Sequence, residues 1–361
     1  MGIGRRAAAG GLAVGVAVGW NLAALGAIAT RLGHAYGVGL ATIGLFTTVQ
    51  FVMHMAMQIP GGRAADRWGA RASALVGPYV WLGLLGRAVV GLGTGLAFVG
   101  GSDYVRARGG TPLLQGVYGG ASVLSPGIAL ALVPGFANWT GFRAPYLSAI
   151  AVVGVAGVLL LAAPASSRTA VPGRRGFDAA FFRDSHLYRL AAIHSLSFGF
   201  SVIVGNWVVT LLEHHGEPKG AAAAAGSLTL LLGFFTRAAG GAMLRRPDAH
   251  HWVEASLVLG GAACVALALP LPLGALVAAA ALVGLAAGVP FATAFTGAAL
   301  ARPDAPGAAV GFVNAWASLA IVAGAPLVGL TFSLPGDGRI GFVVLGALTA
   351  LAALATPRPR R

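Results

Sequence analysis

The sequence predicts an all-α polytopic membrane protein whose twelve transmembrane helices form two similar six-helix halves. Three observations predict this fold class. Apolar residues make up 57% of the 361 residues and charged residues only 9%, and the mean hydropathy is +0.82, which is unlike any soluble domain of this size. Apolar stretches of about 20 residues, enough to cross roughly 30 Å of hydrocarbon as a helix, recur from Ala8 to Pro357. Related glycine patterns also occur twice along the chain.

The first apolar stretch follows Arg5 and Arg6, is too long for a signal-peptide core and lacks a clear cleavage site. We therefore interpret it as span 1 and expect nothing to be removed. Span 3 has only about 14 residues, roughly 21 Å of helix, so we expect a short or tilted crossing with local thinning of the bilayer. The predicted spans cover residues 8–30, 38–60, 72–86, 87–105, 113–135, 143–164, 189–213, 221–244, 252–270, 272–299, 308–332 and 338–356.

The longest polar segment, 166–188, separates the first six spans from the last six. We interpret it as a cytoplasmic linker between an N-terminal half, 1–165, and a C-terminal half, 189–361. No other segment has the composition of a separate domain, so we expect the whole chain to be membrane domain.

Basic residues are distributed unevenly over the predicted loops. All but one of the 24 are arginines, the exception being Lys219. Cytoplasmic loops collect basic residues, so we expect a multi-pass protein of the cytoplasmic membrane with both termini inside. Merging spans 3 and 4 into one crossing would export Arg106, Arg108 and the linker arginines, and the charge bias argues against it. The outer loops hold only Arg31, Arg143, Lys219 and Arg339, while Arg87 and Arg237 fall within spans.

The two halves resemble each other at fixed offsets. Gly62 and Gly241 begin related patterns at an offset of 179, in which Asp66 is replaced by Arg245. Further along, Gly91 pairs with Gly284 at 193, and Gly116 pairs with Gly311 at 195. The offset therefore grows between Arg67 and Gly91, which places a deficit in span 3.

Two motifs in the first half carry a family resemblance. The loop after span 2 reads Gly62-x-x-x-Asp66-Arg67-x-Gly69-x-Arg71, and span 4 reads Arg87-x-x-x-Gly91-x-Gly93-x-Gly95. Both patterns, in this order, resemble signatures of the major facilitator superfamily of secondary transporters.

The resemblance implies a substrate site near the membrane midplane between two halves that rock against each other. It also implies that the loop containing Asp66 links the halves on the cytoplasmic side and stabilises one of the alternating conformations. A lone aspartate among arginines at a span boundary is best explained by pairing.

Buried ionisable groups are costly in lipid and usually face a cavity. Arg237 lies inside span 8, and we expect it to face such a cavity. A guanidinium repels cations and hydrogen-bonds oxyanions, so it favours a small polar or anionic substrate. The candidate substrate-binding residues are the polar side chains within spans: Asn21, His54, Gln58, Tyr118, Asn206, Arg237 and Asn314.

Two sub-branches of the family are partly matched. Arg237-x-x-Gly240-Gly241 resembles the eighth span of nitrate/nitrite porters, but the equivalent of Arg237 is Gln58 and the asparagine expected in span 5 is missing. Ser125-Pro126 stands in place of the Gly-Pro motif of drug antiporters. Neither sub-branch is assigned, and drug or metabolite efflux antiport remains an alternative.

Several partners and cofactors are not expected. The formal charge of +14 reflects arginines scattered through short loops rather than a nucleic-acid surface. A single cysteine, Cys264, leaves no thiol-based zinc site, and the adjacent pairs His214-His215 and His250-His251 lack a third ligand at a suitable spacing. We find no nucleotide or catalytic motif and predict no metal, no cofactor and no enzyme activity. The expected partners are the small-molecule substrate and the lipid bilayer, and the chain is expected to be monomeric.

Proton coupling stays open, because no carboxylate falls in the middle of a span, although His54 and His194 could titrate near neutrality. A transport-inactive sensor or scaffold of the same fold is a further alternative, for which the short span 3 is the best argument. Retained Asp66 and Arg87 argue against it. A membrane enzyme would need carboxylates or histidines clustered at one depth, which the sequence does not show.

Overall fold

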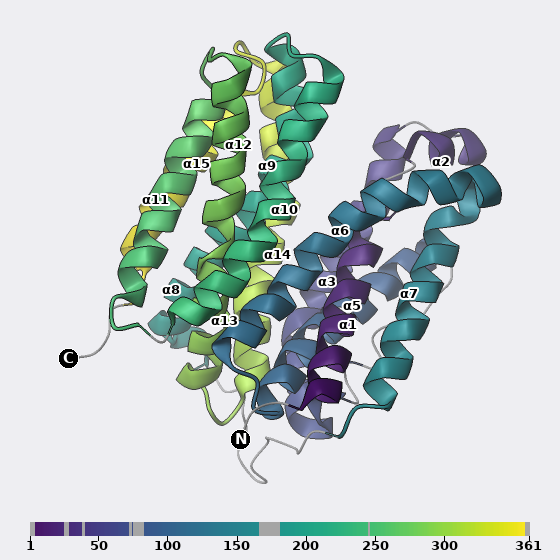
Figure 1. The fold of residues 1–361 in the computed structure, drawn as a ribbon, viewed down its shortest axis with the longest axis vertical. Coiled ribbons are helices and arrows are strands. Elements are labelled where there is room, and N and C mark those ends of the chain that lie inside the picture. Colours follow the sequence, from purple (N-terminus) through teal and green to yellow (C-terminus); the bar gives the residue numbers. More distant parts are fainter. Residues whose placement is uncertain are drawn as a thin grey trace.

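The computed structural model describes residues 4–24, 29–37, 40–71, 74, 83–165, 181–244 and 246–357, and all regular structure in these ranges is helical. This confirms the predicted all-α class. Helices α1–α7 form one group, here called the N-terminal bundle, and α8–α15 form a second, the C-terminal bundle, beside it (Figure 1). In chain order the α-helices are α1 (Arg5–Ala23), α2 (Ala29–Tyr36), α3 (Leu40–Trp68), α5 (Gly83–Ala107), α6 (Pro112–Thr140), α7 (Ala144–Leu161), α8 (Ser185–His194), α9 (Phe200–His214), α10 (Lys219–Met243), α11 (Ala249–Leu267), α12 (Leu273–Gly288), α13 (Pro290–Ala301), α14 (Pro306–Leu330) and α15 (Arg339–Leu351).

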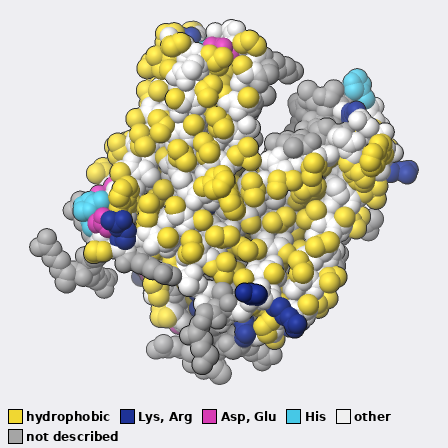
Figure 2. All heavy atoms as spheres, in the orientation of Figure 1, with side chains coloured by type: hydrophobic (Ala, Val, Ile, Leu, Met, Phe, Trp, Pro, Cys, Tyr) yellow, Lys and Arg dark blue, Asp and Glu magenta, His cyan; other side chains and the backbone are white. Residues whose placement is uncertain are grey.

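The surface of both bundles is that of a membrane protein. Figure 2 shows hydrophobic side chains spread over the length of both bundles, with charged side chains and histidines gathered near the helix ends. By length and hydropathy alone, four helical stretches of the described residues qualify as membrane-spanning: Gly135–Leu161, Ser185–His214, Leu273–Ala301 and Pro306–Ser333.

Several span boundaries differ from the sequence prediction. The second span ends at Trp68 rather than at residue 60, so Gly62, Asp66 and Arg67, which the sequence placed in a loop, lie in the last turns of α3. The first span ends at Ala23 rather than near residue 30, and the separate short helix α2 follows it. The fourth begins at Gly83 rather than at residue 87. The seventh begins at Ser185, inside the predicted linker, because the Asp184 carboxylate accepts hydrogen bonds from the backbone N–H groups of His186 and Leu187 and caps α8.

Two spans are not single regular α-helices. The tenth is divided into α12 and α13 before Pro290, which has no backbone N–H and so interrupts the helical hydrogen bonds, although Val289 before it keeps the helical conformation. The seventh contains one π-helical turn, Ser195–Gly199, between α8 and α9. Such turns are frequently found at functional sites, and this one carries Phe198.

The predicted short third span, 72–86, lies mostly outside the described residues, and its last four residues belong to α5. The directions of the neighbouring helices bear on it. Gly91 packs on the backbone oxygen of Gln50 and Gly95 on that of His54, so α3 and α5 run in the same direction.

Two antiparallel helix pairs join the bundles, α3 with α14 and α6 with α10. Gly62 lies against the backbone oxygen of Gly307, and Gly311 against that of Gln58. The second pair repeats this arrangement: Gly241 lies against Pro112 and Gly116 against Arg237. These are the same contacts at the offsets of 179 and 195, so the repeat seen in the sequence sets the register of the interface. Close approach of this kind needs residues without a Cβ atom.

Candidate functional site

A chain of buried polar side chains crosses the interface between the bundles. His54 Nδ1 lies 2.9 Å from Thr94 Oγ1 within the N-terminal bundle. Asn314 Nδ2 on α14 donates to Gln58 Oε1 on α3 at 2.7 Å, and Gln58 in turn donates to the backbone oxygen of His54. His194 Nε2 lies 3.1 Å from Asn314 Oδ1. Because that oxygen can only accept, His194 Nε2 is the donor.

Arg237 lies beside this chain and is 1% exposed. Its guanidinium Nη1 on α10 donates to the backbone oxygen of Gly119 on α6 at 2.5 Å, so this bond also joins the two bundles. The guanidinium carbon lies 5.1 Å from the ring centroid of Phe198 and 4.8 Å from that of Phe291. Cation–π contacts of this kind stabilise a desolvated guanidinium by about 2 kcal/mol. They do not replace a counter-charge.

The polar chain and Arg237 occupy equivalent positions in the two repeats. Gln58 and Arg237 are related by 179, and Asn314 and Gly119 by 195. At the first of these equivalent places, the amides of Gln58 and Asn314 bond to each other. At the second, the guanidinium of Arg237 bonds to a backbone oxygen, because Gly119 has no side chain. The interface is symmetric in its backbone contacts and asymmetric in its charge, because Arg237 has the neutral Gln58 as its repeat equivalent.

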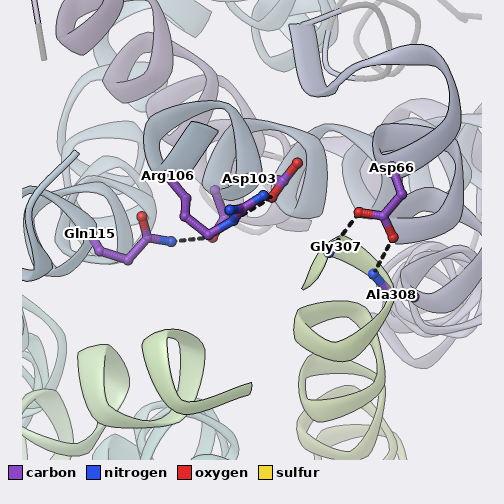
Figure 3. Close-up of polar contacts among 7 residues, drawn as sticks. Asp66, Asp103, Arg106, Gln115, Gly307 and Ala308 are labelled. Atoms are coloured by element: carbon purple, nitrogen blue, oxygen red, sulfur yellow. Dashed lines mark hydrogen bonds and ion pairs between the residues drawn. The ribbon is translucent and has the colours of Figure 1, made fainter. Parts of the chain in front are cut away.

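The Asp66 carboxylate, near the end of α3, closes one end of the interface between α3 and α14. Its Oδ1 accepts from Gly307 N at 2.9 Å and its Oδ2 from Ala308 N at 3.1 Å (Figure 3). Both donors belong to the first turn of α14, where N–H groups have no helical partner and the helix dipole attracts negative charge. Asp66 is 5% exposed. We call this contact the Asp66 latch.

The equivalent place in the second repeat cannot form such a latch. There, Pro112 stands where Gly307 does and has no backbone N–H to donate. Arg245 replaces the aspartate in the sequence but lies outside the described residues. The latch is therefore confined to the α3–α14 pair.

A second buried carboxylate lies on α5 near the latch. Asp103 is 2% exposed and pairs with Arg106, whose Nε donates to Oδ1 at 2.7 Å. Gln115 on α6 donates to Ser102 beside it, which ties the two helices together (Figure 3). The sequence analysis did not identify this ion pair.

The other three predicted candidates, Asn21, Tyr118 and Asn206, have different surroundings, and the ring of Tyr118 packs on that of Phe98 at 5.7 Å between centroids. Asn21 donates to Ala17 of its own helix, and Tyr118 donates to the backbone oxygen of Phe98 at 2.7 Å. Asn206 is exposed on α9 and is not buried with the others. The structure thus brings together four of the seven candidates, namely His54, Gln58, Arg237 and Asn314.

The residues of the two motifs occupy structural positions. Gly69 has a φ of 92°, which lets the chain turn directly after α3. Arg67 is exposed, and Arg71 donates to the backbone oxygen of Leu161 at 2.9 Å. Gly91 and Gly95 permit the close packing of α5 on α3, and Gly93 is buried. Arg87 lies in α5, and its side chain is outside the described residues.

Sequence reasoning missed the aromatic rings around Arg237. Phe291 was not singled out, although the offset of 193 that pairs Gly91 with Gly284 also pairs Phe98 with Phe291. Phe198 lies in the π-helical turn and left no signal in the pattern of an apolar span. Among the described residues, no group of three or more His, Cys, Asp or Glu side chains is arranged to hold a metal ion.

Comparisons with known proteins agree with this architecture. The sequence model described as "Major Facilitator Superfamily" matches residues 11–300. No curated protein matches the sequence significantly. Among solved structures, the E. coli fucose:proton symporter has a TM-score of 0.73 at 15% identity, with 97% of each chain covered. The human organic anion transporter MFSD10 has a TM-score of 0.73 at 15% identity, covering 98% of this chain and 99% of that one. The proton:xylose symporter XylE has a TM-score of 0.74 at 12% identity, covering 97% and 94%.

Proposed function

Because the chain belongs to the major facilitator superfamily, we propose that it is a secondary transporter that moves a small polar or anionic solute across the cytoplasmic membrane by alternating access. The solute binds between the bundles near Arg237, and both termini face the cytoplasm. The single observation that carries the proposal is the fully buried guanidinium of Arg237 at the bundle interface. A buried cation without a carboxylate partner is costly, and an anionic solute would supply the missing charge.

The contacts between the bundles support alternating access. The Asp66 latch, the Gln58–Asn314 bond and the bond from Arg237 to Gly119 all cross the interface and hold one end of it closed. These polar contacts can break and reform, and apolar contacts such as that between the rings of Phe98 and Phe295 lie beside them at the interface. Rocking of one bundle against the other would open this end and close the opposite one.

A proton gradient is a suitable driving force to test. Two of the compared structures are named as proton symporters. His194, which is fully buried and hydrogen-bonded to Asn314, is the described titratable side chain that joins both the polar chain and the rings around Arg237.

Solute counterflow in proteoliposomes tests the proposal. The panel should contain organic anions, inorganic oxyanions, sugars, amino acids and cationic drugs, each with and without a pH gradient. We expect saturable counterflow of an anionic or polar solute that Arg237→Gln abolishes and Arg246→Gln, which removes an exposed loop arginine, leaves intact. Counterflow of cationic drugs alone would favour the efflux antiporter, and no counterflow by a folded protein would favour the transport-inactive scaffold. Either result would overturn the proposal.

A further inference from the structure

His194 is a fully buried histidine whose two ring nitrogens have different surroundings. It is the last residue of α8, directly before the π-helical turn. Nε2 donates to Asn314 Oδ1 at 3.1 Å, whereas Nδ1 is buried and has no hydrogen-bond partner among the described residues. In a neutral ring bonded in this way, Nδ1 holds the lone pair, so a proton can add there without breaking the bond to Asn314.

His194 and Arg237 both lie against the same two aromatic rings. The centroid of the His194 ring lies 5.6 Å from that of Phe198, with 21° between the ring planes, and 5.7 Å from that of Phe291. The guanidinium carbon of Arg237 lies 5.1 Å and 4.8 Å from the same two centroids. Charges interact more strongly in such apolar surroundings than in water. A proton on His194 would therefore be repelled by the arginine across these rings.

Arg237 is the charged side chain that shares these surroundings with His194. The elements that pack mainly on α8 are the π-helical turn, α13, α14 and the short helix 352–355, and none of them contains an ionisable side chain. His54 lies further along the polar chain, beyond Gln58. The other ionisable residues of α8 lie in its first two turns: His186, Tyr188 and Arg189.

No carboxylate of the described residues forms an ion pair with Arg237 or His194. Asp66 and Asp103 are buried carboxylates near the ends of α3 and α5, and they are bound by the first turn of α14 and by Arg106. A proton on His194 alone would place a second positive charge beside Arg237 without a counter-charge, which buried surroundings disfavour. A monoanion near Arg237 cancels the first charge and removes that repulsion.

We propose that His194 carries the proton in a one-to-one symport of a proton with a monoanion. The proton adds to the lone pair of Nδ1 while the anion is bound near Arg237, and it returns to water from Nδ1 when the anion leaves. This assignment rests on the proposed transport function and specifies how that site is coupled to a proton gradient. It requires no carboxylate in the middle of a span.

The charges determine two properties of this transport cycle. A proton and a monoanion together add no net charge to the site, so transport is electroneutral. By linkage, the anion and the proton strengthen each other's binding by the same factor, which for coupled sites is about 5–150-fold. A proton without the anion is disfavoured, so a pH gradient alone drives no proton leak.

Proteoliposomes loaded with the pH-sensitive dye pyranine report the movement of the proton directly. Nitrate, lactate, gluconate and glucuronate represent the monoanions of the counterflow panel, and protein-free vesicles give the background from permeation of the undissociated acids. Valinomycin and potassium set the membrane potential. We expect each anion that shows counterflow to acidify the vesicle interior by one proton per anion, at a rate that does not change with the potential.

His194→Gln separates the proton from the hydrogen bond, because its amide can still donate to Asn314 Oδ1 but does not titrate. We expect this variant to keep measurable counterflow, which needs no net proton movement, and to lose the acidification. In the wild type, the half-saturating anion concentration should fall at least about fivefold from pH 7.5 to pH 5.5, whereas in the variant it should stay constant. His251→Gln, which removes an exposed histidine of α11, is the matched control.

Loss of counterflow and acidification together in His194→Gln would indicate a structural role and overturn the inference. Acidification that persists in this variant, or that disappears in His54→Gln instead, would do the same, as would a wild-type half-saturation that is independent of pH or transport that responds to the potential. Counterflow of uncharged solutes alone, or of an anion without proton movement, would keep the transporter and overturn the coupling. An absence of counterflow for every solute in the broad panel, from protein that remains folded, would overturn both.

Discussion

The side-chain amide of Asn314 on α14 donates a 2.7 Å hydrogen bond to Gln58 Oε1 on α3, and both residues are fully buried. The bond joins helices that are far apart in the sequence and belong to different bundles. Asn314 Oδ1 also accepts from His194, so one amide connects two helices of the C-terminal bundle with one of the N-terminal bundle.

Removing this amide should destabilise the protein beyond the loss of one bond. Interhelical hydrogen bonds in membrane proteins contribute on average ~0.6 kcal/mol and at most ~1.7 kcal/mol. Asn314→Leu in addition leaves Gln58 and His194 without this partner, and each buried unsatisfied group costs about 1–3 kcal/mol. The free energy of unfolding in detergent, measured for Asn314→Leu, Gln58→Leu and the double variant, gives the coupling directly. Strict additivity of the two single changes would contradict a direct bond.

The Asp66 latch predicts a change in conformational populations. Asp66→Ala removes two charge-assisted hydrogen bonds from the first turn of α14, each contributing about 1.5–3 kcal/mol. We expect the closed end to open and the opposite end to close in a measurable fraction of molecules. Membrane insertion should be unaffected, and transport should fall. Spin labels can be attached at Trp139→Cys and Ser333→Cys, which are both exposed at the end of the bundles opposite to the latch. Pulsed electron–electron double resonance should then report a shorter distance between the two labels in Asp66→Ala.

This measurement is practical because Cys264 is the only cysteine and a single replacement provides the background. Asp248→Asn is the matched control, since it changes an exposed carboxylate whose hydrogen bonds, from Arg246 and Trp252, stay within its own region of the chain. An unchanged distance distribution and normal transport in Asp66→Ala would show that the latch does not set the equilibrium.

The glycine contacts at the interface predict a position-specific cost. A Cβ atom at Gly116 would meet the backbone oxygen of Arg237, and one at Gly311 that of Gln58, and a backbone atom cannot move aside as a flexible side chain can. Alanine at either position should therefore lower the melting temperature, although alanine favours a helix over glycine by about 1 kcal/mol. Gly154→Ala on α7, where nothing lies within 4 Å of the added atom, should be neutral or stabilising. Equal melting temperatures for all three variants would argue against close packing at the interface.

The sequence predicted the class and the register of this fold but not its charged contacts. Apolar length and charge bias are properties of whole segments, so they predict membrane helices and their order reliably. The offsets of 179 and 195 further predicted which glycines are equivalent, and the structure places both sets against equivalent backbone oxygens. A repeat makes two positions equivalent, so a contact made by one residue predicts the contact made by its repeat partner.

The partners of Asp66 and Arg237 could not be predicted in this way. Gly307, Ala308 and Gly119 contribute backbone atoms, which any residue type other than proline offers equally, so no side-chain pattern marks them. Helix ends were displaced for a related reason: α8 starts earlier because of the cap at Asp184, and α1 stops at Ala23 within an uninterrupted apolar run. The start of α8 depends on a local hydrogen bond rather than on hydropathy, so an apolar pattern does not reveal it.

A hydrogen bond between the loop after α9 and the start of α15 should make the stability of the C-terminal bundle depend on pH. Arg339 Nε at the start of α15 lies 3.3 Å from His215 Nε2 in the loop after α9. Arginine can only donate, so His215 must be neutral and accept at Nε2. Partial burial, and then the charge of Arg339, hold the pKa of His215 below its ordinary value of 6.5. The unfolded chain therefore takes up this proton at a higher pH than the folded one, and folded-state stability is lost as the pH falls below about 6.5.

We expect the melting temperature of the wild type to fall more between pH 8 and pH 5.5 than that of His215→Gln, whose amide can accept the same bond but does not titrate. An equal fall in melting temperature for the two proteins between pH 8 and pH 5.5 would show that His215 contributes nothing to the pH dependence.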